Sequence, residues 1–113
     1  LLYAFPSKGS IVIDEGAKNA LVENNASLLP IGVTAVEGSF EQGDAVKIYY
    51  NKINSEKCIA KGISQYDSSE LQKIKGLQST EISEVLGYVS SETIVQKDDM
   101  VLLENVTNKE VIK

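Results

Sequence analysis

The stretch ASLLPIGVTAVEGSFEQGDAVKIYY, residues 26–50, decides the fold because turn residues separate short apolar runs in it. Leu28 and Leu29 precede Pro30, which predicts a turn with two apolar anchors. Residues 33–40 and 45–51 are rich in Val, Ile and Tyr, a composition typical of strands. Gly43-Asp44 lies between the two runs, and we expect it to close an antiparallel hairpin.

On the N-terminal side of this stretch, the sequence predicts a strand followed by a helix. Residues 10–13 are Ser-Ile-Val-Ile and form the expected first strand. Asp14 follows at the position of a helix N-cap, and residues 15–25 carry apolar residues at helical spacing. Asn24-Asn25 tolerates the left-handed backbone that ends such a helix.

On the C-terminal side, residues 57–66 predict another strand, in which Gly62 marks a bulge or the close approach of another backbone. Asp67 and Glu70 have the spacing of a capping box and predict a short helix that ends before Gly76. We expect Leu71 and Ile74 to form its inner face. A second short helix is expected from Ser79 to Gly87, with Ile82, Val85 and Leu86 on one face.

Residues 92–96 and 100–104 predict two closing strands, separated by a turn at 97–99. Residues 105–113 are polar and predict a frayed tail, which leaves one domain over residues 1–104. The expected fold is mixed α/β and mainly β. It is a curled sheet of about six strands, with short helices after strands one and four.

The composition indicates a globular domain with one core. With 113 residues, the chain can remove roughly two thirds of its extended-chain surface from water. No apolar run approaches the roughly 18 residues of a membrane span, so no membrane partner is expected. Cys58 is the single cysteine, which excludes an intrachain disulfide and favours a reducing, cytoplasmic setting. Because the chain begins with Leu and shows no signal-peptide pattern, we interpret it as a piece of a longer polypeptide.

The charged residues argue against tight binding of nucleic acid. The chain has 11 Lys and Arg against 16 Asp and Glu, a net charge of -5, and every cation in it is Lys. Arg supplies the planar fork that grips phosphate and guanine through two hydrogen bonds. The absence of Arg and the acidic total therefore disfavour RNA as a partner.

Catalysis and metal binding lack their usual residues. The chain has no His, so a proton-transfer site would need a strongly shifted carboxylate or Lys. Cys58 has no His partner and is interpreted as a small core residue. Zinc sites need several Cys or His ligands. Asp98-Asp99 is interpreted as a solvated turn and Asp14-Glu15 as a helix cap, so we expect no catalytic residue, no metal and no cofactor in this segment.

Tyrosines and lysines of the expected sheet offer an RNA-binding interpretation and a plainer one. Aromatic side chains can stack on the bases of a single strand, and Lys can neutralise phosphates. In an alternating strand, however, one of two adjacent aromatics faces the core, and scattered Lys residues are usually solvated. The residues in question are Tyr49, Tyr50, Tyr66 and Tyr88, with Lys47, Lys57 and Lys61.

The order of these motifs resembles a known family. GSIVIDEGAKNAL (9–21), SLLPIGVTAVEGSFEQGDAV (27–46), IAKGISQYDSSEL (59–71), STEISEVLGY (79–88) and VQKDDMVLL (95–103) together resemble the PUA domain, in the form found at the C-terminus of glutamate 5-kinases. The resemblance runs from about Tyr3 to Glu104. It implies a PUA-like pseudo-barrel with helices against its ends.

The resemblance also implies a parent enzyme that transfers the ATP γ-phosphoryl group to the side-chain carboxylate of glutamate, the first step of proline biosynthesis. ATP and magnesium would bind an upstream amino-acid-kinase domain, and none of that chemistry would reside here. One hypothesis is therefore a non-catalytic module that packs on the kinase domain or on a neighbouring subunit and contributes to regulation or assembly.

The other hypothesis is an RNA-binding PUA domain of an RNA-modifying protein. In such proteins a groove beside the first helix and the Leu-Leu-Pro turn holds RNA. Gly16 and Gly32 serve helix entry and turn geometry equally well. The corresponding residues of this groove, for RNA or for a protein partner, are Asp14, Gly16, Ala17, Lys18, Leu29, Pro30, Gly32 and Val33.

Overall fold

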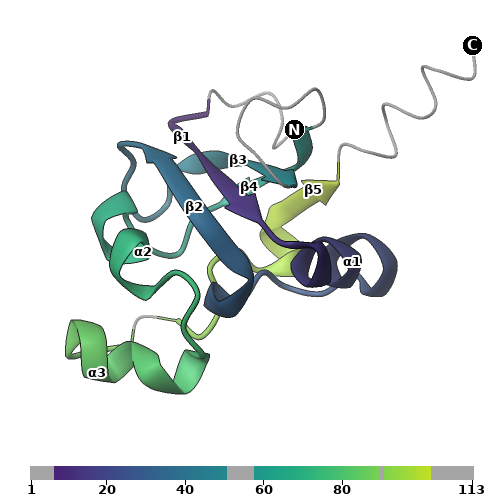
Figure 1. Ribbon diagram of the computed structural model, residues 1–113. Coiled ribbons are helices and arrows are strands. Elements are labelled where there is room, and N and C mark those ends of the chain that lie inside the picture. Colours follow the sequence, from purple (N-terminus) through teal and green to yellow (C-terminus); the bar gives the residue numbers. More distant parts are fainter. Residues whose placement is uncertain (1–6, 51–57, 90, 103–113) are drawn as a thin grey trace, which may run out of the picture.

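The computed structural model describes residues 7–50, 58–89 and 91–102, which form a five-stranded mixed sheet with three short α-helices (Figure 1). Helices follow the first and fourth strands, so the expected mixed α/β and mainly β class is confirmed. The elements in chain order are β1 (Gly9–Ile13), α1 (Glu15–Asn24), the 3₁₀ turn η2 (Pro30–Gly32), β2 (Val33–Gly38), β3 (Ala45–Tyr50), β4 (Cys58–Ile63), α2 (Ser68–Ile74), η3 (Ser79–Glu81), α3 (Ile82–Leu86), η4 (Lys97–Asp99) and β5 (Met100–Leu102).

The first strand lies inside the sheet, whose order is β2-β1-β3-β4-β5. β1 pairs antiparallel with β2 and parallel with β3. The predicted hairpin between β2 and β3 is therefore wrong, because β1 lies between these strands. The Gly43-Asp44 turn does reverse the chain, with Asp44 N donating to Glu41 O at 3.0 Å. Local turn residues fix a reversal of direction, whereas the apolar run of β1 fills the place between the two strands.

The strand expected over residues 92–96 is also absent, so the described residues hold five strands instead of about six. This segment makes an isolated bridge between Leu28 and Val95 and accepts a hydrogen bond from Gln65 N at Ile94 O. Ile94 and Val95 are both fully buried. The segment thus lies between Leu28 and Gln65, and its contact with Leu28 is a single bridge that does not extend into a ladder.

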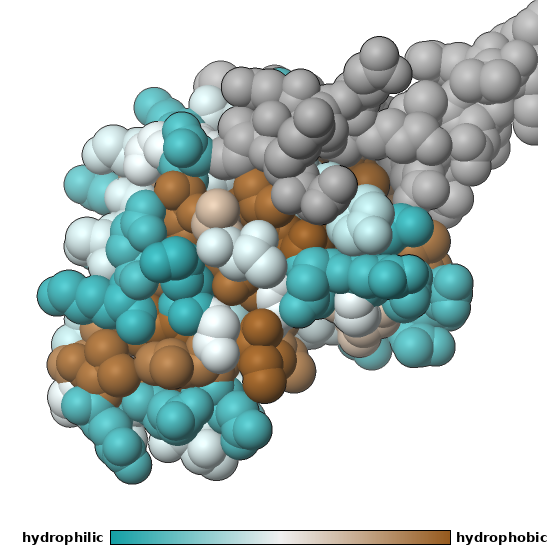
Figure 2. All heavy atoms as spheres, in the orientation of Figure 1, coloured by the Kyte–Doolittle hydropathy of each residue, from teal (hydrophilic) through white to brown (hydrophobic). Residues whose placement is uncertain are grey.

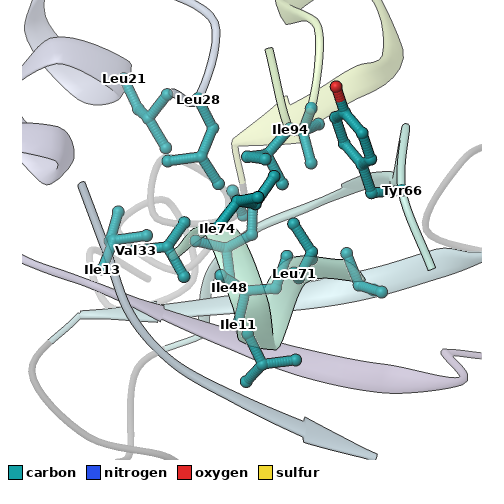
Figure 3. Packing of buried hydrophobic residues seen from close by; sticks show 14 of the residues in the cluster. Ile11, Ile13, Leu21, Leu28, Val33, Ile48, Tyr66, Leu71, Ile74 and Ile94 are labelled. Carbon is teal, nitrogen blue, oxygen red and sulfur yellow. The ribbon is translucent and has the colours of Figure 1, made fainter. Parts of the chain in front are cut away.

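The core lies between the sheet and the helices, and Figure 3 shows Ile11 and Ile48 of the sheet close to Leu71 and Ile74 of α2. Both α2 residues are fully buried, which confirms the predicted inner face of this helix. Val85 of α3 is different, because 45% of it is exposed. The predicted stripe is wrong at this position, since α3 is little more than one turn long and buries only its Ile82 side.

Local signals for helix ends are confirmed. Asp67 Oδ1 accepts from Glu70 N at 2.7 Å, and Glu70 Oε1 accepts from Asp67 N at 2.9 Å, which completes the capping box of α2. Asn25 ends α1 at φ 53° and Gly87 ends α3 at φ 84°, both in the left-handed region. Gly62 has its predicted close neighbour, because a Cβ there would lie 3.1 Å from Asp99 O.

Across the described ranges, no helix is long and apolar enough to cross a membrane. The predicted tail over residues 105–113 lies outside the described residues.

Candidate functional site

Asp14 joins three elements at one end of the sheet, where Figure 1 places α1 beside the end of β1. Its Oδ1 accepts from Ala17 N at 2.8 Å and caps α1 as predicted. Its backbone N donates to Gly32 O at 3.0 Å. The start of α1 is thereby held against η2, the turn that enters β2.

Gly32 permits the close contact between η2 and α1. A Cβ at Gly32 would lie 2.5 Å from Ala17 Cβ, well inside the normal separation of two carbon atoms. Gly16 is different, because the nearest atom to a Cβ there is Asp14 Oδ1 at 3.6 Å. Neither glycine has a positive φ. Gly32 is therefore required because a larger residue would clash with Ala17, whereas a Cβ at Gly16 would meet no close neighbour.

A cavity of about 300 Å³ lies between the first turns of α1 and the segment that leads into β2. Nine of its ten lining residues are uncharged, and the tenth is Asp14. Leu29 and Ile31 at this site are 44% and 49% exposed, large fractions for such apolar side chains. The lining residues are Asp14, Gly16, Ala17, Ala20, Ala26, Ser27, Leu28, Leu29, Ile31 and Gly32.

The charges that line the cavity favour an uncharged ligand or side chain. None of its ten lining residues is a cation. The Asp14 carboxylate repels a phosphate, although it is already engaged by the amide of Ala17. Ser27 contributes a hydroxyl, but its Oγ accepts from Lys97 N at 3.0 Å. An apolar side chain of a protein fits this lining better than a charged group does.

The structure brings together five of the eight residues predicted for the groove: Asp14, Gly16, Ala17, Leu29 and Gly32 line the cavity. The other three lie elsewhere. Pro30 and Val33 are buried beneath the surface, and Lys18 places its Nζ 5.0 Å from the centre of the Tyr50 ring. Binding of RNA or of a partner in this groove stays a prediction.

Sequence reasoning missed the other half of the lining. Ala20 lies one helical turn after Gly16 and Ala17, so helical spacing would have found it. Ile31 follows Pro30 and is turned outward by η2. Ala26 and Ser27 come from the turn after α1, and their contact with the cavity depends on how that turn folds back.

The predicted aromatic and basic surface does not form as one unit. Tyr66 is fully buried and Tyr49 is 7% exposed, so the packing interpretation holds for both. Lys61 is 6% exposed, which removes it from any surface that meets phosphates, whereas its cross-strand neighbour Lys47 is exposed. Lys57 lies outside the described residues.

The remaining candidates for metal binding or catalysis, the Asp98-Asp99 pair and Cys58, form no such site among the described residues. Asp98 and Asp99 lie in η4, a turn as expected, and no group of three His, Cys, Asp or Glu side chains there could hold a metal ion. Cys58 is half-buried, with its Sγ 3.2 Å from Ala60 O, so its expected place in the core is wrong. The pairing of β3 with β4 has a bulge after Ile48, next to Cys58 at the start of β4.

Comparisons with known proteins agree with this geometry. The PUA domain family matches residues 9–86. Glutamate 5-kinase of Salinibacter ruber is 45% identical over 102 residues, which are 90% of this chain and 27% of that enzyme. A glutamate 5-kinase of Haemophilus influenzae is 48% identical over the same shares. A crystal structure of a PUA domain from Aeropyrum pernix K1, in complex with tartrate, has a TM-score of 0.56 and 29% identity, and the match covers 79% of this chain and 41% of that one.

The matched segment is the C-terminal part of those kinases, and the chain spans about 27% of the length of these curated relatives. A match over 102 of 113 residues necessarily includes residues 12–102. Residues 87–102 are therefore shared with glutamate 5-kinases, although they lie beyond the family match at 9–86.

Proposed function

Since the chain belongs to the PUA domain family, we propose that it is the non-catalytic C-terminal module of a glutamate 5-kinase and contributes to regulation or assembly of that enzyme. The upstream part of the polypeptide would bind ATP, magnesium and glutamate and would carry out phosphoryl transfer. Such a biosynthetic enzyme would work in the cytoplasm, where the lone Cys58 stays reduced.

The cavity beside α1 carries this proposal. Its lining is apolar, its single charge is a carboxylate, and Leu29 and Ile31 expose large apolar surfaces next to it. Apolar surface at a concave site is typical of contacts with protein or with small apolar groups. We therefore propose that the cavity receives an apolar side chain of the kinase domain or of a neighbouring subunit.

The first test is the sequence upstream of Leu1, which should encode an amino-acid-kinase domain. The second compares the full enzyme with a form truncated before Tyr3, by turnover, inhibition by proline and oligomeric state. At least one of these properties should change. If all three are unchanged, the domain contributes to neither regulation nor assembly.

Point variants separate the cavity from the rest of the domain. Ile31→Asp places a second carboxylate beside the cavity and should reproduce part of the effect of truncation. Ser39→Asp is the matched control, because Ser39 is also exposed but does not line the cavity. Equal behaviour of the two variants would show that the cavity is not the contact.

Binding of RNA in the same groove is the alternative. The first turn of α1 favours it, because the amides of Glu15 and Gly16, unlike that of Ala17, are not capped by Asp14 and suit a phosphate. An electrophoretic titration with single-stranded RNA at two salt concentrations decides between the two functions. Neutralisation of Z phosphates predicts a log–log slope of about -0.7Z, and no shift at low salt rejects RNA.

A further inference from the structure

A second apolar surface lies at α3, whose residues do not line the cavity. Val85, Tyr88 and Val89 are 45%, 48% and 47% exposed, and together we call them the α3 patch. Figure 2 shows hydrophobic residues gathered at the lower left of the molecule, where Figure 1 places α3, with hydrophilic residues on both sides. Half-exposed apolar residues clustered in this way typically mark a contact surface.

The α3 patch is held in a fixed conformation. Gly87 ends α3 at φ 84°, which turns the chain so that Tyr88 follows directly. The Tyr88 hydroxyl donates to Glu70 Oε2, and the other oxygen of this carboxylate closes the capping box of α2. The exposed ring is thus tied to α2. A surface that is already ordered before binding loses less conformational entropy when a partner covers it.

Acidic side chains surround the α3 patch. Residues 67–92 contain five carboxylates and two Lys residues, and Lys75 Nζ is turned back to Gln72 O at 3.3 Å. Glu81 lies one helical turn before Val85 on the same side of the short helix, and Glu84 is exposed beside it. A partner that covers the patch should therefore present an apolar centre with Lys or Arg around it.

The same charges disfavour a second copy of this domain as the partner. A two-fold contact centred on the patch would bring the acidic surroundings of one copy close to the acidic surroundings of the other, and like charges that meet at an interface oppose binding. In addition, residues 87–89 lie beyond the PUA family match but inside the segment shared with glutamate 5-kinases. About three quarters of the length of the Salinibacter ruber enzyme lies outside this match, so the polypeptide offers a large further surface for the patch to contact.

We propose that the α3 patch docks on a basic-rimmed apolar surface of the kinase part of the glutamate 5-kinase polypeptide. This inference rests on the proposed function above. It names a contact made by residues that do not line the cavity, so the two surfaces can be tested separately.

Photo-crosslinking in the full-length polypeptide tests the contact. Val89→benzoylphenylalanine places a reactive group in the patch, and Gln42→benzoylphenylalanine is the control in an exposed turn far along the chain. Crosslinked peptides are identified by mass spectrometry. We expect the patch probe to link to kinase peptides at least about tenfold more than the control does, the contrast between a buried interface position and open surface. Links to a second copy of this domain, or yields equal to the control, overturn the proposal.

Charge reversal tests independently whether the partner surface is basic. Glu84→Lys should reduce the crosslink from Val89 by about fivefold at low salt, because it places a cation against a basic rim. Glu23→Lys, on the exposed face of α1, is the matched control and should leave the yield unchanged. If two copies of the domain met at this patch, Glu84→Lys would raise the yield, because it places a cation of each copy close to the remaining carboxylates of the other.

The proposed function can fail separately. If truncation before Tyr3 alters assembly while Val89 gives no kinase crosslink, only the α3 contact is wrong. If truncation alters nothing, the regulatory or assembly role is wrong whatever the crosslinks show.

Discussion

Two glycines at the cavity should respond to alanine with opposite signs. Gly32→Ala places a Cβ 2.5 Å from Ala17 Cβ, whereas a Cβ at Gly16 meets nothing closer than 3.6 Å. Neither position has a positive φ, so backbone strain contributes to neither result. The difference in unfolding free energy between the two variants therefore measures the packing of η2 on α1.

The magnitudes follow from these contacts. Normal separation of two carbon atoms requires η2 and α1 to move apart by about 1 Å in Gly32→Ala. Overpacking of this size costs about 1–3 kcal/mol of the unfolding free energy. Gly16→Ala instead removes backbone freedom from the unfolded chain and improves helix propensity, which should stabilise by up to about 1 kcal/mol.

Urea denaturation followed by circular dichroism measures both changes, and Ala17→Gly provides the cross-check. Alone, this variant should destabilise α1 by up to about 1 kcal/mol. Combined with Gly32→Ala, it removes the blocking Cβ, so the pair should be more stable than the sum of the single changes by at least about 0.5 kcal/mol. Additive effects, or a Gly32→Ala variant as stable as the parent, would show that η2 and α1 are not in contact as described.

Three further changes probe individual hydrogen bonds. Tyr66→Phe keeps the buried ring but removes the hydroxyl, which donates to Ser91 O and accepts from Ser91 N at 2.9 Å. The variant should lose about 1–3 kcal/mol of unfolding free energy, measured by urea denaturation. No loss would contradict these bonds. Asp14→Ala should cost about 1 kcal/mol in the same assay, because α1 loses its cap, while Asp14→Asn should retain most of the stability. The pKa of the Tyr88 phenol is raised above 10.0, first by its hydrogen bond to Glu70, then by desolvation and by nearby carboxylates. Its stabilising effect is therefore fully present below pH 10 and is lost as the pH rises through the raised pKa. Tyr88→Phe should remove a part of the tyrosine absorbance that titrates above pH 10, and no change in that part would contradict the bond.

Structural features that depend on residues close together in the sequence could be predicted. Asp14, the Asp67 and Glu70 pair, Asn25 and Gly87 end or begin helices as predicted, because each cap is completed within a few residues. The positions of the other strands, unlike the one expected over residues 92–96, could be predicted for the same reason, since alternation and turn residues are local.

Features that depend on distant segments were not readable. The sequence around Gly43-Asp44 shows where the chain turns, but the strand that fills the space beside β2 comes from residues 9–13. Lys61 looked like a surface residue because its sequence neighbours do not reveal what covers β4. In the candidate site, the residues around Asp14 and Gly32 were found through the family resemblance, whereas Ala26 and Ser27 join the lining only through the path of the turn after α1.

The central position of β1 has a consequence for synthesis on the ribosome. β2 can pair with β1 early, but the other edge of β1 must wait for β3, whose last residue lies 37 positions after Ile13. At translation rates of roughly 5–20 residues per second, this delay is about 2–7 s. During that interval the nascent chain carries an apolar strand, Ile11 to Ile13, with both edges open until β2 is complete and one edge open afterwards. Chaperones that bind nascent chains and shield such edges should therefore matter most while residues 14–50 are being made.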